Sequence, residues 1–157
     1  NDTATTEIYT RSLVGSGQMC IRDSYWEGEG GRSYHHTAPV NSLYGLHEAL
    51  VALKEEGLEN SWKRHLDNHL ILREGLEKLG IDFLVDEQDR LPQLNAIYIP
   101  EGVEDLKSRQ KLLNDFNLEI GAGLGVLAGK VWRIGLMGSS SNKNNIEYCL
   151  SSLQKVI

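Results

Sequence analysis

The residues best suited to chemistry lie in two short segments. The first is Tyr34-His35-His36-Thr37, which comes just before a helix-start pattern. The second runs from Val131 to Gly135, where Arg133 stands among apolar neighbours. Hydroxyl groups beside a helix N-terminus are typical of phosphate sites. An arginine in an apolar strand needs an anionic partner, and its guanidinium matches a carboxylate with two parallel N–H groups.

Each segment also has a plainer interpretation. The hydroxyls of Tyr34 and Thr37 can serve as local caps of the following helix. Arg133 can pair with an internal Asp or Glu, or with the carboxylate of a bound acid. The glycine-rich stretch 121–129 precedes Arg133 directly, so it can leave room for a small acid there. The residues alone leave these alternatives open.

Other chemical motifs fail on spacing or context. His35 and His36 would point to opposite faces of a strand, so they cannot easily share one ion, and we predict no metal site. The i,i+4 pair His65 and His69 lacks a metalloprotease signature. The glycines of Gly121–Gly125 fit neither phosphate-loop nor dinucleotide spacing, and predict a flexible connection between two strands. No nucleophile elbow is present.

Composition narrows the function classes further. The 157 residues suit one core-forming domain, with 40% hydrophobic and 24% charged residues. A net charge of −6 argues against a nucleic-acid partner. No apolar run approaches the roughly 18 residues of a membrane span. Two isolated cysteines, Cys20 and Cys149, argue against a disulfide scaffold and favour a reducing, cytoplasmic setting.

Periodicity predicts an α+β fold. Helices are expected at 42–56, 58–79, 103–116 and from Asn142 or Asn144 to Val156, and short strands at 81–85, 96–99, 118–120 and 131–136. Gly57 and Gly80 would end the first two helices. In the second helix we expect an inward face made of Trp62, Leu66, Leu70, Leu76 and Leu79. The helices would pack on a short mixed or antiparallel sheet.

The first 24 residues differ in character from the remainder. They show no sustained periodicity, and residues 10–24 resemble a translated sequencing adapter, with a natural flexible linker as the alternative. We therefore expect residues 1–24 to be a non-homologous, disordered tail and residues 25–157 to be the domain. The missing initiator Met suggests that the chain is a fragment of a longer protein.

From Tyr25 to Ile157 the chain resembles the small C-terminal domain of class V (fold-type I) aminotransferases, specifically the alanine–glyoxylate/serine–pyruvate group. No single motif is decisive, but their order and spacing are specific. The resemblance is carried by Tyr34-His35-His36-Thr37-Ala38-Pro39-Val40, Ser42-Leu43-Tyr44, Gly57-Leu58-Glu59-Asn60-Ser61-Trp62, Arg90-Leu91-Pro92, Leu118-Glu119-Ile120, Gly123-Leu124-Gly125 and Gly129-Lys130-Val131-Trp132-Arg133-Ile134-Gly135.

The resemblance implies a homodimeric enzyme that uses pyridoxal 5'-phosphate. It would transfer an amino group from alanine or serine to glyoxylate or a similar 2-oxo acid. The residues matching Tyr34 and Thr37 reach the cofactor phosphate held mainly by the neighbouring subunit, and the residue matching Arg133 holds the substrate carboxylate. These expectations favour cofactor binding for Tyr34 and Thr37, and substrate binding for Arg133.

The chain departs from the family at one essential point. The lysine that anchors the cofactor covalently lies upstream of the Tyr-His-His-Thr segment in the family, whereas the first lysine here is Lys54. Lys130 does not match that position and is expected to be a solvated surface charge. We therefore expect no catalytic residue in this chain and no activity of the chain alone. Alternatives are another class V enzyme, such as a lyase or a phosphoserine-type aminotransferase, and a non-catalytic α+β interaction module.

Overall fold

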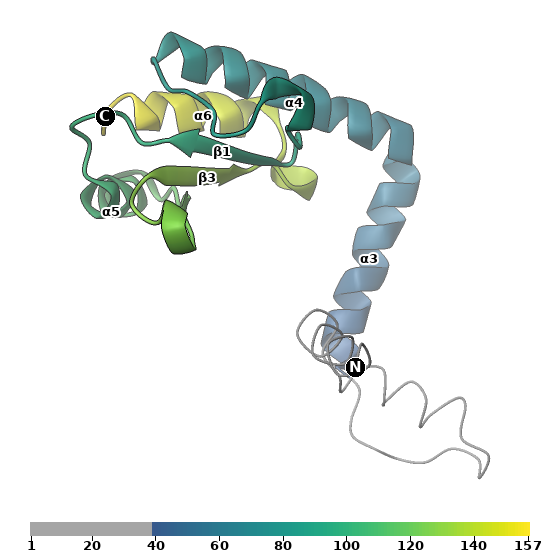
Figure 1. Ribbon diagram of the computed structural model, residues 1–157. Helices are drawn as coiled ribbons and strands as arrows, with labels where there is room; N and C mark the ends of the chain where they lie inside the picture. The colour runs from purple at the N-terminus through teal and green to yellow at the C-terminus, as the bar shows by residue number, and fades with distance from the viewer. Residues whose placement is uncertain (1–38) are drawn as a thin grey trace, which may run out of the picture. The chain divides into compact units, whose positions relative to one another are not determined.

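The computed structural model describes residues 39–157 (Figure 1). The chain divides into two compact units, residues 1–51 and 52–157. Helix α3 (Val40–Glu56) crosses the boundary between them, and none of its side chains is buried. All other described elements belong to the second unit. No described helix has both the length and the apolar character needed to cross a membrane.

The second unit alternates helices with short strands. Its elements are α4 (Leu58–Lys78), β1 (Leu94–Tyr98), α5 (Asp105–Phe116), β2 (Gly121–Ala122), β3 (Val131–Gly135) and α6 (Lys143–Leu153). Short 3-10 turns lie at Glu87–Asp89, Gly125–Leu127 and Gly138–Ser140. The helix ends follow local chemistry. Gly57 and Gly80 end the first two helices with φ angles of 83° and 73°, and Asn142 caps α6 by accepting a hydrogen bond from the Asn145 N–H.

The three strands form an antiparallel sheet in the order β1-β3-β2. Ile97 of β1 pairs with Trp132 of β3, and Ala96 pairs with Arg133. On its other side, β3 pairs Arg133 with Gly121 and Trp132 with Ala122. β3 is therefore the central strand, although it comes last of the three in the chain.

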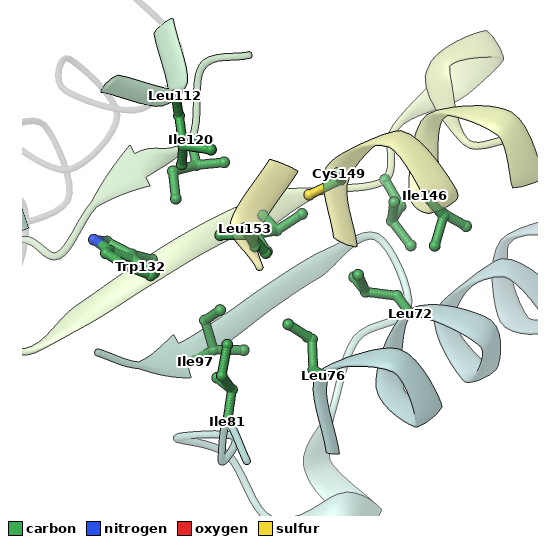
Figure 2. Close-up of a cluster of buried hydrophobic side chains, with 12 residues drawn as sticks. Leu72, Leu76, Ile81, Ile97, Leu112, Ile120, Trp132, Ile146, Cys149 and Leu153 are labelled. Atoms are coloured by element: carbon green, nitrogen blue, oxygen red, sulfur yellow. The ribbon is translucent and has the colours of Figure 1, made fainter. Parts of the chain in front are cut away.

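One face of this sheet is covered by the helices (Figure 2). Ile97, Trp132 and Ile134 point into a core that also receives side chains from all three helices of the unit. The helix contributions are Leu72 and Leu76 from α4, Leu112 from α5, and Ile146, Cys149 and Leu153 from α6. The predicted α+β class, with helices on a short antiparallel sheet, is confirmed.

Two predicted strands are wrong. Residues 81–85 make only one bridge, Phe83 to Ile97, before the chain turns away at Glu87–Asp89. Residues 118–120 form no strand, because the Leu118 N–H closes the end of α5 on the Leu112 carbonyl. Pairing with β3 begins only at Gly121. The last helix also ends at Leu153, earlier than expected.

The predicted inward face of α4 is wrong over its first half. Trp62, Leu66 and Leu70 are exposed, while Leu76 is buried and Leu79 partly buried. The buried face of the first half is instead polar, with Ser61, His65, Asn68 and His69. These four residues continue the helical spacing of Leu72 and Leu76, so the core-facing stripe changes from polar to apolar along one helix. Hydropathy alone selected the wrong stripe.

A partly buried polar contact joins α5 to the sheet. The indole Nε1–H of Trp132 donates to Asp105 Oδ1 at 2.9 Å, and the Arg109 Nε–H donates to the same oxygen at 2.7 Å. The guanidinium of Arg109, assisted by Trp132, holds the pKa of the Asp105 carboxyl below its usual value. The ionised carboxylate therefore stabilises the folded state.

We predict that Asp105→Asn lowers the free energy of unfolding by about 1 kcal/mol at pH 7. The amide oxygen still accepts a hydrogen bond from Trp132, but the ion pair with Arg109 is lost. The folded-state pKa is lowered, so this contribution is present above the unfolded pKa and is lost as pH falls through the folded value. Urea denaturation from pH 7 to pH 3 measures it. Glu104→Gln is the matched control, because Glu104 pairs with Lys107 at an exposed site. A stability difference that persists unchanged at pH 3 would contradict the prediction.

Candidate functional site

Arg133 lies at the centre of the sheet, on the face opposite the core. Side chains alternate along β3, so the burial of Trp132 and Ile134 directs Arg133 to the other side. Its paired neighbours are Ala96 on β1 and Gly121 on β2. Both are small, which leaves space beside the half-buried arginine. β3 therefore positions the guanidinium, and the small residues Ala96 and Gly121 leave it accessible to a ligand.

The glycine at position 121 is part of this arrangement. A Cβ built on Gly121 would lie 3.3 Å from an Nη atom of Arg133 and 3.4 Å from its Nε. The Arg133 Nε–H donates to the Ala122 carbonyl at 2.8 Å. The guanidinium therefore lies along β2, in a space that any side chain at position 121 would narrow.

Arg133 has no ion pair with any acidic side chain among residues 39–157. Its one hydrogen bond to the described residues uses Nε, which leaves the N–H groups of the two terminal nitrogens available. A half-buried guanidinium with open donors is suited to a carboxylate, which it can bind in a bidentate manner. Within the described part of the chain, the internal-partner interpretation of Arg133 therefore finds no support.

The loop between β2 and β3 is an ordered turn. Gly123 donates its N–H to the Val131 carbonyl, and Leu127 donates to the Leu124 carbonyl. A Cβ on Gly123 would lie 2.0 Å from the Leu127 carbonyl oxygen, so only glycine fits there. Gly125 and Gly129 have positive φ angles of 55° and 71°. The expected positive φ in this loop is confirmed, whereas its hydrogen bonds make it a defined turn and not the flexible connection expected. Close approach of a ligand to these glycines stays a prediction. Lys130 at the end of the loop is exposed as predicted.

Two polar contacts that sequence reasoning missed hold β3 from the side of α4. Asn95 lies directly opposite Ile134. Its Oδ1 accepts a hydrogen bond from His69 Nδ1 at 2.7 Å, and its amide Nδ2 donates to the Ile134 carbonyl. The available signal was a polar residue between Leu94 and Ala96 in an apolar strand. These bonds join α4 to the peptide that follows Ile134, one residue beyond Arg133.

The second contact holds the turn after β3. Arg64 binds the Glu56 carboxylate and donates to the carbonyls of Gly138 and Ser141 at 2.9 and 2.8 Å. Asn68 donates to the same Ser141 carbonyl. The Arg64 guanidinium holds the pKa of Glu56 below its usual value, and the carboxylate raises the pKa of Arg64. Nothing in the sequence marks this contact, since its partners lie more than 70 residues apart.

The histidines fall into different environments. His65 and His69 are buried on α4, where His65 Nδ1 lies 2.7 Å from the Ser61 carbonyl. His47 is exposed beside Glu48. No group of three or more metal-ligating side chains occurs among residues 39–157. Tyr34, His35, His36 and Thr37 lie outside the described residues, as does the predicted boundary at Ser24, so these remain predictions.

Comparison with known proteins places this geometry in a family. No protein-family model matches the chain. Alanine–glyoxylate aminotransferase of Callithrix jacchus is 37% identical over 162 residues, covering 100% of the chain and 39% of that protein. The crystal structure of alanine–glyoxylate aminotransferase from Nostoc is 46% identical with a TM-score of 0.80, covering 88% of the chain and 36% of the solved one.

A third likeness is the crystal structure of ureidoglycine–glyoxylate aminotransferase from Bacillus subtilis. It is 31% identical with a TM-score of 0.80 and covers 99% of this chain and 41% of the solved one. The chain thus spans about two fifths of the length of these relatives.

The fold is that of the small domain of fold-type I aminotransferases. Within this class, the chain belongs with the alanine–glyoxylate aminotransferases and related class V, pyridoxal-phosphate-dependent aminotransferases.

We predict that Gly123→Ala destabilises the second unit by about 2 kcal/mol, because the new methyl group meets a backbone carbonyl that cannot rotate away. Thermal or urea unfolding measures the loss, and the NMR signal of the Arg133 Nε–H reports whether the guanidinium moves. Gly135→Ala is the matched control, because a Cβ there finds only ordinary contacts, the nearest at 3.6 Å. Equal effects of the two substitutions would show that the loop tolerates the methyl group.

Proposed function

We propose that this chain forms the substrate-carboxylate side of an aminotransferase active site within a longer parent enzyme. The parent would transfer an amino group from alanine or serine to glyoxylate or a similar 2-oxo acid. The observation that carries the proposal is Arg133, a half-buried guanidinium that faces away from the core and pairs with no described carboxylate. Family membership supplies the reaction class.

In this proposal Arg133 binds the α-carboxylate of the amino or 2-oxo acid. The bond from its Nε–H to the Ala122 carbonyl fixes the guanidinium plane, so the terminal N–H groups are oriented before the substrate arrives. Ala96 and Gly121 provide the space for a small acid. The contact of Asn95 holds β3 near its end, and the contacts of Arg64 hold the turn that follows it.

The proposed cofactor is pyridoxal 5'-phosphate, which supplies the electron sink that amino-group transfer requires. Tyr34 and Thr37 are proposed to donate their hydroxyls to its phosphate, across the interface of a cytoplasmic homodimer. Around Arg133, the residues present fit a bound substrate acid, because Gly121 leaves open the space that a Cβ would fill. No lysine precedes Tyr34, so the covalent anchor would come from elsewhere in the parent.

The names of the relatives support glyoxylate as the amino acceptor. The Callithrix and Nostoc proteins are named for alanine and glyoxylate, and the Bacillus subtilis protein for ureidoglycine and glyoxylate. The donor thus varies among these three relatives while the acceptor does not. Binding of the shared acceptor's carboxylate is the role we assign to Arg133.

We predict that Arg133→Ala in the parent enzyme lowers kcat/KM on the order of 100-fold or more, because two charge-assisted hydrogen bonds to the substrate are lost. Stability should change little. Steady-state kinetics together with urea unfolding measure both. Arg90→Ala is the matched control, since Arg90 is also half-buried and donates its Nε–H to a carbonyl, that of Val85. Loss of stability with unchanged substrate affinity per folded molecule would indicate a structural role for Arg133.

A separate prediction concerns the 157-residue chain by itself. Supplied with pyridoxal 5'-phosphate, alanine and glyoxylate, it should produce no pyruvate above the rate of the free cofactor, because no lysine occupies the anchoring position. A lactate dehydrogenase-coupled assay for pyruvate measures this. Turnover that depends on the protein would show that another residue of the chain replaces the missing anchor.

A further inference from the structure

A cavity of about 390 Å³ opens between α6 and the end of β3. It lies where β3 loses a neighbour, because β2 pairs only with Trp132 and Arg133. On that side, residues 134–136 have no strand partner in the described part of the chain. The segment 117–120 after α5 and the first turns of α6 enclose the space instead. Every lining residue belongs to the second unit.

The inner wall of the cavity is apolar. It consists of residues that are all buried in the hydrophobic core, four of which are labelled in Figure 2: Leu72, Ile120, Ile134, Leu136, Ile146 and Cys149. Burial raises the pKa of the Cys149 thiol to about 11, so the sulfur is uncharged at neutral pH and belongs to the apolar wall. An apolar cavity of about 150 Å³ holds a benzene ring, so this one has room for a ring and a short side arm.

The hydroxyls at the rim of the cavity can act only as hydrogen-bond acceptors. The Tyr148 O–H donates to the Phe116 carbonyl at 2.5 Å, and the Ser140 O–H donates to the Met137 carbonyl at 2.6 Å. A hydroxyl has a single hydrogen, so both oxygens retain lone pairs but no further donor. A ligand at this rim must therefore bring N–H or O–H groups of its own.

The charge at the rim is negative. Glu119 is exposed there and forms no ion pair with a basic side chain among residues 39–157. The carboxylates of Asp105, foremost, and Glu119 raise the pKa of Arg109, but the Arg109 guanidinium bonds Asp105 and does not line the cavity. None of the described lining residues is Lys, Arg or His. The carbonyl end of α5, at its cap Asn117, adds a partial negative charge.

We propose that this cavity binds an organic ammonium ion, with its hydrocarbon part against the apolar wall and its N–H groups on the oxygens of the rim. An anion would meet Glu119 and the carbonyl end of α5, which both repel it. A small cation without hydrocarbon would leave the apolar wall in contact with water. The proposal uses none of the roles proposed for Arg133, Tyr34 and Thr37, so its failure would leave the proposed function unaffected.

Titration of the 157-residue chain with phenethylamine, followed by the amide signals of its ¹H–¹⁵N NMR spectrum, tests the site. The probe carries a phenyl ring and, at pH 7, an ammonium group. For a ligand of about nine heavy atoms we expect a dissociation constant on the order of 1 mM. The largest shifts should occur at the amides of Gly135, Ile146 and Cys149. Phenylacetate, which has the opposite charge, and ethylamine, which lacks the ring, should each bind at least about tenfold more weakly.

A pair of variants tests the role of the rim charge. Glu119→Gln should weaken phenethylamine binding about three- to fivefold, because the amide keeps the size of the side chain and loses its charge. Glu101→Gln is the matched control, since Glu101 is also exposed but does not line the cavity, and it should leave the affinity unchanged. The dispersion of the β3 and α6 amide signals shows in the same spectra that each variant is folded.

Four results would overturn the proposal. They are the absence of saturable phenethylamine binding, shifts scattered over the acidic surface, binding of phenylacetate or ethylamine as tight as that of phenethylamine, and equal effects of Glu119→Gln and Glu101→Gln.

Discussion

The organisation of this protein depends on the alternation of side chains along β3. Trp132 and Ile134 enter the core, so the alternation places Arg133 on the opposite face of the sheet. Because β3 is the central strand, paired on both edges, its register cannot slip without exposing the indole of Trp132. The burial of one apolar face thus sets the position of one cation. The hydrogen bonds of Asn95 and Arg64 stabilise this position of the Arg133 guanidinium, and Gly121 leaves space beside it.

The contacts that hold β3 and the turn after it are polar. They come from the first half of α4, whose buried face carries polar residues. His69 reaches Asn95, which bonds the Ile134 carbonyl, while Arg64 and Asn68 hold the carbonyls of the turn at 138–141. These bonds satisfy backbone groups where the strand ends and the next helix has not begun. They also explain the reversal of faces along α4. Its inner side carries hydrogen-bonding residues, and its leucines and Trp62 are left outside.

How much could be anticipated differs between elements. The helices were predictable because Gly57, Gly80 and Asn142 act through local backbone chemistry. The β3 strand was predictable because apolar residues flank Arg133 on both sides. The strands at 81–85 and 118–120 were not, since strand formation requires a continuous partner in register. Residues 82–84 pair with β1 at a single bridge only, and the Leu118 N–H bonds back to the end of α5. For the site, Arg133 was identifiable from its apolar surroundings, whereas the bond to Ala122 and the small neighbours Ala96 and Gly121 follow from sheet pairing.

The sequence by itself determined the family, the ends of α3 and α4 at Gly57 and Gly80, and the residue that we propose to bind the substrate. These depend on local residue types and their order along the chain. The tertiary structure decided which face of α4 is buried, which strand is central and that Arg133 has no acidic partner among the described residues. Those properties arise from segments more than 30 residues apart, such as β1 and β3, whose contacts no local pattern encodes. The physical reason is that a helix face is buried, or a strand is paired, only when a second segment packs against it, and the local sequence does not specify that second segment.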